Sequence, residues 1–311
     1  MQSHLKKTLL IGGNGFIGAA LAQALHATQR SVSVVSRSPN KNPLLDASIA
    51  YHQGNFGDLA FISPLIAAHD EIVHLAYASV PNTSFENPLT DLQENLTPSV
   101  QLFLETAKLG KRLLLVSSGG TVYGEACYIP ISEVHPKHPI SPYGLTKLTL
   151  ENYANLYSVT HGLEYMVVRP GNAYGIGQTP FKGQGFVATA IASARLGKAI
   201  KIFGLNGSVR DYIYITDLAN AIVSTLTAGR ANECYNIGTG IGYNNLELIN
   251  YINTLLRVKH HAPLHVEYVP SRPFDVKCNV LDYAKLNHHT GWEPLVSLEQ
   301  GLSMTIDNLF L

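Results

Sequence analysis

The turn after the first apolar run carries three glycines at the spacing of a phosphate-binding turn. The run at 8–13 reads TLLIGG, and Gly12, Gly15 and Gly18 form G-x-x-G-x-x-G. Glycine permits a tight turn, a close approach of the backbone to a pyrophosphate, and close packing of the next helix on the strand. A helix beginning near Gly15 would point its amide dipoles at the phosphates. Because the motif lies between a strand and a helix, it predicts a βαβ unit that binds a dinucleotide.

Strand and helix patterns alternate through the first half of the chain. Apolar β-branched runs predict strands, and apolar residues at helical spacing predict helices. The predicted strands are 8–13, 31–36, 48–53, 71–76, 111–118 and 163–170. The predicted helices are 15–28, 58–68, 91–109 and 142–161. Continuous apolar runs are typical of strands covered on both faces, so we expect the α/β class with a Rossmann-type doubly wound parallel sheet.

The second half has shorter elements and is richer in Gly, Pro and Asn. Its predicted strands are 199–204, 234–238 and 263–269, and its predicted helices are 216–228 and 244–256. We expect a dinucleotide-binding Rossmann domain over residues 1–170, with segments near 210–237 returning to it. A smaller C-terminal α+β substrate-binding part would occupy residues 171–311.

The composition limits the partners of the chain. Its 22 basic and 22 acidic side chains cancel, which argues against nucleic-acid binding. The N-terminal residues contain no apolar run long enough for a signal peptide or membrane span, so we expect a cytoplasmic protein without a membrane span. Cys127, Cys234 and Cys278 lack metal-ligand spacing, and we expect buried free thiols and no metal site.

The end of the second predicted strand indicates which dinucleotide the chain accepts. A site that prefers NAD usually carries an acid at this place for the ribose hydroxyls. This chain has Ser36 and Arg37 instead, and a guanidinium there suits the 2′-phosphate of NADP. The alternative is a solvated surface arginine. The expected cofactor is NAD or NADP, with Arg37 favouring tolerance of NADP.

A tyrosine and a lysine stand four positions apart in SPYGLTKLTLENY at 141–153. On a helix, Tyr143 and Lys147 share one face. A free tyrosine has a pKa of about 10, but a neighbouring ammonium and a positively charged oxidised nicotinamide both favour the tyrosinate. A lowered pKa would bring Tyr143 into the range of efficient general base catalysis. The pair therefore predicts a proton acceptor beside a bound nicotinamide.

Several motifs occur in an order that resembles a known family. They are the glycine spacing, VSSGGTVYG at 116–124, YGLTK at 143–147, RPGNAYG at 169–175, GSVRDYIYITD at 207–217, YNIGTG at 235–240 and RPFD at 272–275. Together they resemble the extended short-chain dehydrogenase/reductase family, and within it the NAD-dependent epimerase/dehydratase family. The resemblance covers nearly the whole chain and is strongest to UDP-glucose and UDP-N-acetylglucosamine 4-epimerases.

The resemblance implies a catalytic set and a cofactor site. Tyr143 would be the base, and Lys147 would also hydrogen-bond the cofactor ribose. Relatives carry Ser or Thr at the place of Gly119, so the hydroxyl that polarises the sugar oxygen would come from Thr121 or Ser118, and we favour Thr121. The cofactor-binding residues that we assign are Gly12, Gly15, Phe16, Ile17, Gly18, Arg37, Asn55, Ala76, Asn95, Tyr143 and Lys147.

The second half supplies the sugar-nucleotide side by resemblance. With Thr121, the substrate-binding residues implied are Asn172, Arg210, Arg272 and Asp275. Two guanidinium groups match the charge of a diphosphate, although Arg210 could instead form a structural ion pair with Asp211. Tyr123 and Tyr174 would line the sugar pocket. Asn279, which is smaller than a tyrosine, would leave room for an N-acetyl group.

The same resemblance leaves more than one reaction open. A 4,6-dehydratase of the family would show Thr-Asp-Glu at 119–121, where this chain has Gly-Gly-Thr. We expect a nucleotide-sugar 4-epimerase that acts on UDP-hexoses, UDP-N-acetylhexosamines or a lipid-linked sugar, in cell-surface polysaccharide synthesis. An NADPH-dependent keto-sugar reductase and a non-catalytic dinucleotide-sensing or scaffold protein are the alternatives. The family implies a homodimer formed through the helices near 91–109 and 142–161.

Overall fold

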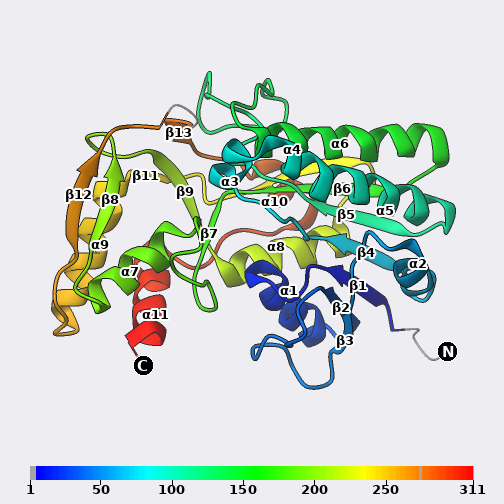
Figure 1. Ribbon diagram of the computed structural model, residues 1–311, viewed down its shortest axis with the longest axis horizontal. Helices are drawn as coiled ribbons and strands as arrows, with labels where there is room; N and C mark the ends of the chain where they lie inside the picture. Colours follow the sequence, from blue (N-terminus) through cyan, green and yellow to red (C-terminus); the bar gives the residue numbers. More distant parts are fainter. Residues whose placement is uncertain (1–4, 273–274, 311) are drawn as a thin grey trace.

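The computed structural model describes residues 5–272 and 275–310. A sheet in the order β10-β6-β5-β4-β1-β2-β3 forms its centre, and all neighbouring strands in it are parallel (Figure 1). The strands are β1 (Lys7–Ile11), β2 (Ser31–Ser36), β3 (Ala50–Gln53), β4 (Glu71–His74), β5 (Arg112–Val116), β6 (Tyr165–Pro170) and β10 (Glu233–Ile237). The predicted α/β class with a doubly wound parallel sheet is confirmed.

Helices cover both faces of this sheet because successive strand residues point to opposite sides. In β1, Leu10 packs into the cluster that contains α1 (Phe16–Ala27) and α8 (Ile215–Ala228). Its neighbours Leu9 and Ile11 pack into the opposite cluster. The helices of that second face are α2 (Leu59–Ala67), α5 (Thr97–Lys108) and α6 (Pro142–His161). Burial on both faces explains why the strands read as continuous apolar runs.

The strand order reverses between β1 and β4, which are neighbours in the sheet although β2 and β3 lie between them in sequence. In doubly wound sheets, ligands bind outside the carboxyl ends of the strands at such a switch point. The glycine loop follows β1 at this place. The loops that follow β4 and β5 leave the sheet from the same edge, because all three strands are parallel. The fold therefore brings the glycine loop and the segments after β4 and β5 to the carboxyl edge of the sheet, where doubly wound folds form their ligand crevice.

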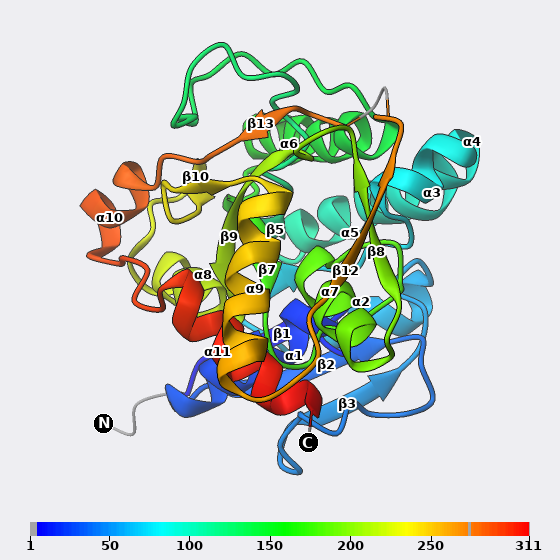
Figure 2. The same ribbon diagram turned by 90° about the vertical axis from the view of Figure 1, so that its left-hand side faces the viewer.

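The second half of the chain forms smaller sheets (Figure 2). One contains β7 (Asn172–Tyr174), β9 (Val209–Tyr214), β11 (Gly242–Tyr243) and β13 (Cys278–Asn279), and the other pairs β8 (Ala199–Phe203) with β12 (His265–Val269). The accompanying helices are α7 (Phe186–Arg195), α9 (Asn245–Val258), α10 (Ala284–Thr290) and α11 (Leu298–Phe310). In the sequence, β10 and α8 occur among these elements. In the structure, β10 is a strand of the central sheet and α8 packs on that sheet.

The helix predicted near 91–109 is confirmed, but it includes a turn of a different kind. The chain forms α3 (Pro81–Glu86) and then an unbroken helical run of α4 (Pro88–Asp91), a π-helical turn η1 (Leu92–Leu96) and α5. Pro98 lies at the second position of α5 and has no amide hydrogen for a bond to the preceding turn. The wider π turn occurs directly before this proline, and such turns are frequent at functional sites.

The cysteines and the helices bear on two further expectations. Cys127, Cys234 and Cys278 are free thiols, and Cys127 is exposed, so the prediction that all three are buried is wrong. Among the helices described, none is both long enough and apolar enough to cross a membrane. The described residues also contain no group of three or more His, Cys, Asp or Glu placed to hold a metal.

Candidate active site

The glycine loop packs so tightly that two of its glycines admit no side chain. Gly12 has a φ of +87°, and a Cβ there would stand 2.6 Å from the amide nitrogen of Ala76. A Cβ on Gly18 would stand 2.5 Å from Cα of Gly13. Gly15 differs, because a Cβ there would meet no atom closer than the Gly12 carbonyl oxygen at 3.5 Å. The open side of the loop is therefore at Gly15, where a pyrophosphate can approach the backbone.

The beginning of α1 offers free donors at this open side. Its N-cap, Gly15, has no side chain to accept a hydrogen bond from the first turn. The amides of Phe16 and Ile17 have no backbone acceptor among the described residues. A helix N-terminus with unpaired amides attracts anions. The loop thus fits the diphosphate of a dinucleotide by its shape and by its donors.

Other predicted cofactor residues border the same crevice. Ala76 follows β4, and its amide donates to the Ile11 carbonyl oxygen at 2.8 Å, so it is held against the end of β1. Asn55 follows β3, and its Oδ1 accepts the Gly57 amide at 3.1 Å. Arg37 follows β2, is exposed, and forms no ion pair within the described chain. The nearby Lys41 has its ammonium on the carbonyl oxygens of residues 46, 47 and 49.

Asn95 stabilises the loop that follows β4. It lies in the π turn, is 2% exposed, and its Oδ1 accepts the Ala78 amide at 2.7 Å. Its Nδ2 donates to the Asp91 carbonyl oxygen at 2.9 Å. These bonds fix the loop that follows β4. Asn95 therefore has a structural role in this loop. The sequence analysis predicted only a contact of Asn95 with the cofactor.

Tyr143 and Lys147 occupy one face of α6. Ser141 caps the helix by accepting the Gly144 amide at 3.2 Å, and Pro142 occupies the first helical position. The Tyr143 amide donates to the hydroxyl of Ser84 on α3 at 3.1 Å. Lys147 is 4% exposed, and its Nζ donates to the Val116 carbonyl oxygen at 2.9 Å. The pair therefore lies at the carboxyl end of β5.

Burial dominates the electrostatics of this pair. It raises the pKa of the Tyr143 phenol, the charge of Asp91 raises it further, and a hydrogen bond with Ser118 lowers it. Burial lowers the pKa of Lys147 to about 7, against the opposing charges of Glu151 and Asp91. In the chain without a cofactor the Tyr143 pKa is therefore raised, because a buried phenolate is costly, and its lowering beside a bound oxidised nicotinamide stays a prediction. Any compensating positive charge must come from bound ligand and from a protonated Lys147.

The two candidate hydroxyls differ in their bonding. Ser118 is half-buried, and its hydroxyl lies near enough to the Tyr143 phenol to lower the pKa of that phenol. The Thr121 Oγ1 is buried and has no partner among the described residues. An unpartnered buried hydroxyl is costly and is suited to a ligand that completes it. Sequence reasoning favoured Thr121 for the role beside Tyr143, whereas the structure brings Ser118 into contact with the phenol.

Gly119 departs from the family pattern for a steric reason. A Cβ there would stand 2.8 Å from the Arg169 carbonyl oxygen, 3.0 Å from the Pro170 carbonyl oxygen and 2.5 Å from the Leu281 side chain. The Gly119 amide donates to the Pro170 carbonyl oxygen at 2.9 Å. The turn therefore lies too close to β6 for serine or threonine. A hydroxyl at this position is excluded unless the backbone moves.

The structure gives the following surroundings to the predicted substrate residues. Asn172, on β7, places its Oδ1 3.6 Å from the position of a Cβ on Gly120. Arg210 donates from Nη1 to its neighbour's carbonyl oxygen, and burial lowers its pKa against the charge of Asp275. Arg272 forms a two-point ion pair with Asp275 at 2.8 and 3.1 Å. The intervening Pro273 and Phe274 of the RPFD motif lie outside the described residues.

The alternative of a structural pair between Arg210 and Asp211 is not what the structure shows. Asp211 accepts bonds from the amides of Thr239, Gly240 and Leu281. Among the ion pairs of residues 5–272 and 275–310, none joins it to Arg210. The Arg210 guanidinium therefore stays a candidate for binding an anion.

Two tyrosines predicted to line the sugar pocket are core residues instead. Tyr123 is fully buried, donates to Asn236 at 2.7 Å and accepts from Arg169 at 2.7 Å. Tyr174 is 1% exposed and donates to the Leu298 carbonyl oxygen at 3.3 Å. A phenol can be fully buried when its hydroxyl finds a partner, as both do here. Neither can contact a sugar without opening the core.

Asn279 lies under the same turn and is 1% exposed. Its Nδ2 donates to the Gly119 carbonyl oxygen at 2.8 Å, while its Oδ1 is buried without a partner in the described chain. Its neighbour across the β9–β13 pair is Arg210. The carboxamide thus connects the strand of Arg210 to the turn of the active site.

Sequence reasoning missed Tyr77, Ser84 and Asp91. The Tyr77 ring meets the Tyr143 ring edge-on with centroids 4.8 Å apart, and Asp91 is a buried carboxylate that accepts a bond from Thr146 at 2.7 Å. They lie in a segment that carries no catalytic motif. A signal was available in the pair of prolines, Pro81 and Pro88, which marks short helices and therefore a folded loop next to the crevice.

The chain is similar to proteins of one family over almost its entire length. The model of the "NAD dependent epimerase/dehydratase family" matches residues 8–238. A putative UDP-glucose 4-epimerase of Methanocaldococcus jannaschii is 30% identical over 96% of this chain and 97% of its own. A dTDP-glucose 4,6-dehydratase of Xanthomonas campestris is 29% identical over 96% of this chain and 92% of its own. Relatives with different reactions therefore share these levels of identity.

Solved structures of similar fold include two UDP-glucose 4-epimerases. That of Thermotoga maritima, determined with UDP-glucose, is 32% identical, covers 98% of both chains and has a TM-score of 0.91. That of Thermus thermophilus, in complex with NAD, is 28% identical, covers 98% of this chain and 99% of its own, and has a TM-score of 0.90. Together with the glycine loop and the Tyr143–Lys147 pair, the family match shows that this chain belongs to the NAD-dependent epimerase/dehydratase family of the extended short-chain dehydrogenases/reductases.

Proposed function

We propose that the protein is a nucleotide-sugar 4-epimerase that acts on a UDP-hexose or a UDP-N-acetylhexosamine. The observation that carries the proposal is the position of Tyr143, with Lys147 one turn away on the same helix, at the strand ends beside the glycine loop. A base, a hydroxyl and a cation at the switch point are the groups that reversible oxidation of an alcohol requires.

Each residue has a part in this reaction. Bound NAD would accept the C4 hydride and return it, and its oxidised ring would carry positive charge. Tyr143 removes the proton of the 4-hydroxyl and gives it back after the 4-keto sugar has turned its other face. Ser118 and Thr121 donate to the sugar oxygen as its charge changes. Lys147 holds the cofactor ribose and supplies the positive charge that offsets the burial of the phenolate.

Dehydration is disfavoured by the same turn. A dehydratase of this family would need acidic groups at positions 120 and 121 to eliminate water across neighbouring carbons. This chain has Gly120 and Thr121 there. The position of Gly120 is spacious, since a Cβ there would lie 3.6 Å from the Asn172 Oδ1, so the acid is absent by sequence and not for lack of room.

A keto-sugar reductase is the second candidate, and Arg37 is the observation that favours it. Its guanidinium is exposed at the end of β2, beside the place where a 2′-phosphate would lie, whereas the Lys41 ammonium is occupied by three carbonyl oxygens. We infer that the site tolerates NADP and NADPH, and a reductase would oxidise one NADPH to NADP at each turnover. A non-catalytic dinucleotide-sensing protein is the third candidate, and the complete Tyr143–Lys147 pair argues against it.

The diphosphate of the substrate would lie between Arg210 and Arg272. Arg272 stacks on Phe203, with its guanidinium carbon 3.9 Å from the ring centroid, and it faces Asp275. A guanidinium held flat on a ring keeps its fork of donors in a fixed plane, which suits a phosphate. This arrangement supports a nucleotide-linked substrate, with a lipid-linked diphosphate sugar as the related possibility, and a role in cell-surface polysaccharide synthesis.

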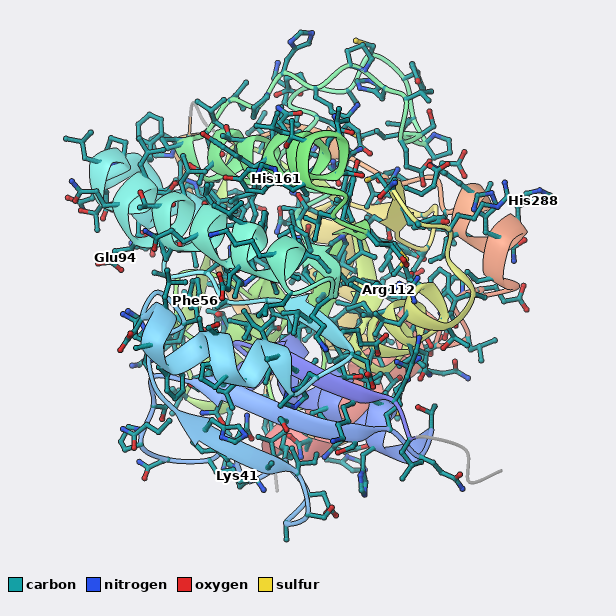
Figure 3. The ribbon with its side chains drawn as sticks, turned by 90° about the vertical axis from the view of Figure 1, so that its right-hand side faces the viewer. Lys41, Phe56, Glu94, Arg112, His161 and His288 are labelled. Atoms are coloured by element: carbon teal, nitrogen blue, oxygen red, sulfur yellow. The ribbon has the colours of Figure 1, made fainter. Side chains whose placement is uncertain are left out.

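We also propose a homodimer through the layer of α5 and α6, which run side by side (Figure 3, where Glu94 and His161 mark this layer). Exposed apolar side chains lie on one stripe of α6, namely Leu145, Leu156 and Val159, which are 56, 46 and 80% exposed. Their spacing of eleven and three residues returns to the same helical face. Leu92, in the adjacent π turn, extends this apolar surface.

Proton NMR of candidate sugars incubated with the protein tests the function. UDP-glucose and UDP-N-acetylglucosamine, each supplied with NAD and then with NADPH, report the configuration at C4 through the anomeric and ring proton couplings. Interconversion of the C4 isomers without net use of cofactor supports the epimerase. Change that occurs only on a 4-keto sugar with consumption of NADPH would select the reductase and overturn the first proposal.

A further inference from the structure

A second phenol, Tyr77, lies against both members of the catalytic pair. The Lys147 Nζ stands 4.2 Å from the centroid of the Tyr77 ring and 5.8 Å from that of Tyr143. The face of an aromatic ring attracts a cation, and the attraction grows where water is excluded. Lys147 is therefore held by the Tyr77 ring on one side and by the Val116 carbonyl oxygen on another.

The hydroxyl of Tyr77 ends on a buried carboxylate. It donates to Oδ2 of Asp91 at 3.3 Å, and Asp91 is 1% exposed. Thr146, the residue before Lys147, donates to the same oxygen at 2.7 Å, and the Ser79 hydroxyl donates to Oδ1. All of these donors are neutral, and the ion pairs of the described residues do not include Asp91. These hydrogen bonds provide the carboxylate with partners but not with a counter-ion.

The other titratable groups near Lys147 do not supply a second cation for the Asp91 carboxylate. Glu151, one turn further along α6, is bound by Arg169 through bonds of 3.0 and 2.5 Å. His74, on β4, has its pKa lowered to about 3 by burial and by the charge of Lys147, so it is neutral at pH 7. The protonated phenol of Tyr143 carries no charge. The Tyr77 ring thus carries Lys147 over its face and binds Asp91 through its hydroxyl, and the charge of Asp91 acts on Lys147.

We propose that Asp91 and Tyr77 are positioning residues that keep Lys147 charged and hold its ammonium toward the cofactor side of the site. A phenol that donates to an anion has a more electron-rich ring, which strengthens its hold on a cation. Asp91 therefore acts on Lys147 directly through its charge and indirectly through Tyr77. The inference rests on the proposed function only in that it gives the charged lysine a catalytic use.

A lysine titration in the cofactor-free chain tests the proposal without any sugar chemistry. Protein labelled with ¹³C at lysine Cε is titrated by NMR, and the Lys147 signal is assigned by its absence in Lys147→Arg. Asp91→Asn keeps the shape and the acceptor oxygen but removes the charge, and we expect the Lys147 midpoint to fall by about one pH unit. Asp307→Asn, on the remote α11, removes a carboxylate as a control and should leave the midpoint unchanged. An unchanged midpoint in Asp91→Asn overturns the proposal.

Variants of Tyr77 provide a second measurement in case Asp91→Asn does not fold. Tyr77→Phe retains the ring and removes the bond to Asp91, whereas Tyr77→Leu removes the ring as well. We expect the Lys147 midpoint to fall in both, and further in Tyr77→Leu, because the ring attracts the charged form of the lysine. Midpoints equal to wild type in both variants would overturn the part assigned to Tyr77.

The pH profile of sugar turnover distinguishes positioning from mere structure. Catalysis that needs a charged Lys147 declines as the pH rises through the lysine midpoint. In Asp91→Asn this alkaline limb of kcat/KM should move about one unit toward acid, in step with the NMR midpoint. A lower rate with an unmoved limb would contradict the inference. If no sugar reacts at all, the proposed function fails, while the lysine titration still decides the inference.

Discussion

The cofactor side and the nucleotide side of the crevice are built in opposite ways. On the proposed cofactor side, the available groups belong to the backbone: Gly12 and Gly18 pack without room for a side chain, and the amides of Phe16 and Ile17 have no backbone acceptor in the described chain. On the nucleotide side, the groups are side chains that already have partners. Arg272 binds Asp275 and stacks on Phe203.

This difference predicts different costs of binding. A backbone cradle that is fixed by close packing loses little freedom when a ligand arrives, so its affinity reflects its contacts. Arginine side chains must exchange an internal carboxylate for a phosphate, which weakens the net gain. We therefore expect the dinucleotide to bind to the chain without sugar, and the sugar nucleotide to order the second side as it binds.

Tyr143 lies where the two sides meet, and we expect the substitution Tyr143→Phe to have the largest effect on turnover. It removes the hydroxyl that exchanges the proton but keeps the ring against Tyr77. We expect turnover to fall about 10²–10⁴-fold, with dinucleotide affinity changed little. Steady-state kinetics and a cofactor titration measure the two effects. A variant with near-normal turnover would show that Tyr143 is not the base.

Gly15 and Gly12 separate binding from stability on the cofactor side. Gly15→Val points into open space, so the fold should remain while dinucleotide affinity falls tenfold or more, on the order of 1–3 kcal/mol. Gly12→Ala meets the Ala76 backbone and has a positive φ, so it should lower the free energy of unfolding. Calorimetry for binding and urea unfolding for stability compare them. Equal losses of stability in both would contradict the open position of Gly15.

Arg272→Lys tests the nucleotide side. Lysine keeps the charge but loses the planar fork and the stacking on Phe203. We expect KM for the sugar nucleotide to rise about tenfold with turnover less affected, since the fork binds a group remote from C4. Arg195→Lys, on α7 away from the crevice, is the matched control. An unchanged KM in Arg272→Lys would remove this residue from the diphosphate site.

His74 gives the smallest predicted effect, in the pH dependence of stability. Burial lowers its pKa to about 3, while the unfolded chain takes up this proton near pH 6.5. Above pH 6.5, the neutral, buried His74 therefore does not lower the free energy of unfolding. This free energy decreases as the pH falls toward 3. Between pH 7.5 and 5 the loss should be about 2 kcal/mol. Urea unfolding of His74→Gln at both values should lack this part of the change.

The sequence predicts the sheet well because its strands are buried on both faces and its helices carry clear caps. The helix predicted at 142–161 has the bounds of α6, since Ser141 and Pro142 mark its beginning and Gly162, with a φ of +69°, its end. The sequence did not reveal the π turn within the helix predicted at 91–109, because apolar periodicity continues through residues 92–96. A local register change of this kind leaves the pattern of residue types nearly intact.

The site was predictable where backbone geometry or helix spacing fixed it, and not where tertiary contacts did. Tyr143 and Lys147 follow from their spacing on one helix. The contact of Ser118 with the phenol depends on the angle of the turn after β5, which no local pattern records. Tyr123 and Tyr174 occur in family motifs, yet both are core residues whose hydroxyls bind distant backbone or side chains. Sequence position near a motif does not tell which face a side chain takes.

The close contact of the Gly119 turn with β6 has a consequence for engineering. A serine at 119 would press on two carbonyl oxygens of the Arg169–Pro170 peptides as well as on Leu281. Trimming Leu281 relieves only one of these clashes, so the more common hydroxyl cannot be restored by one or two exchanges. Laboratory evolution of this enzyme toward other sugars should begin from the existing glycine and vary the residues around it.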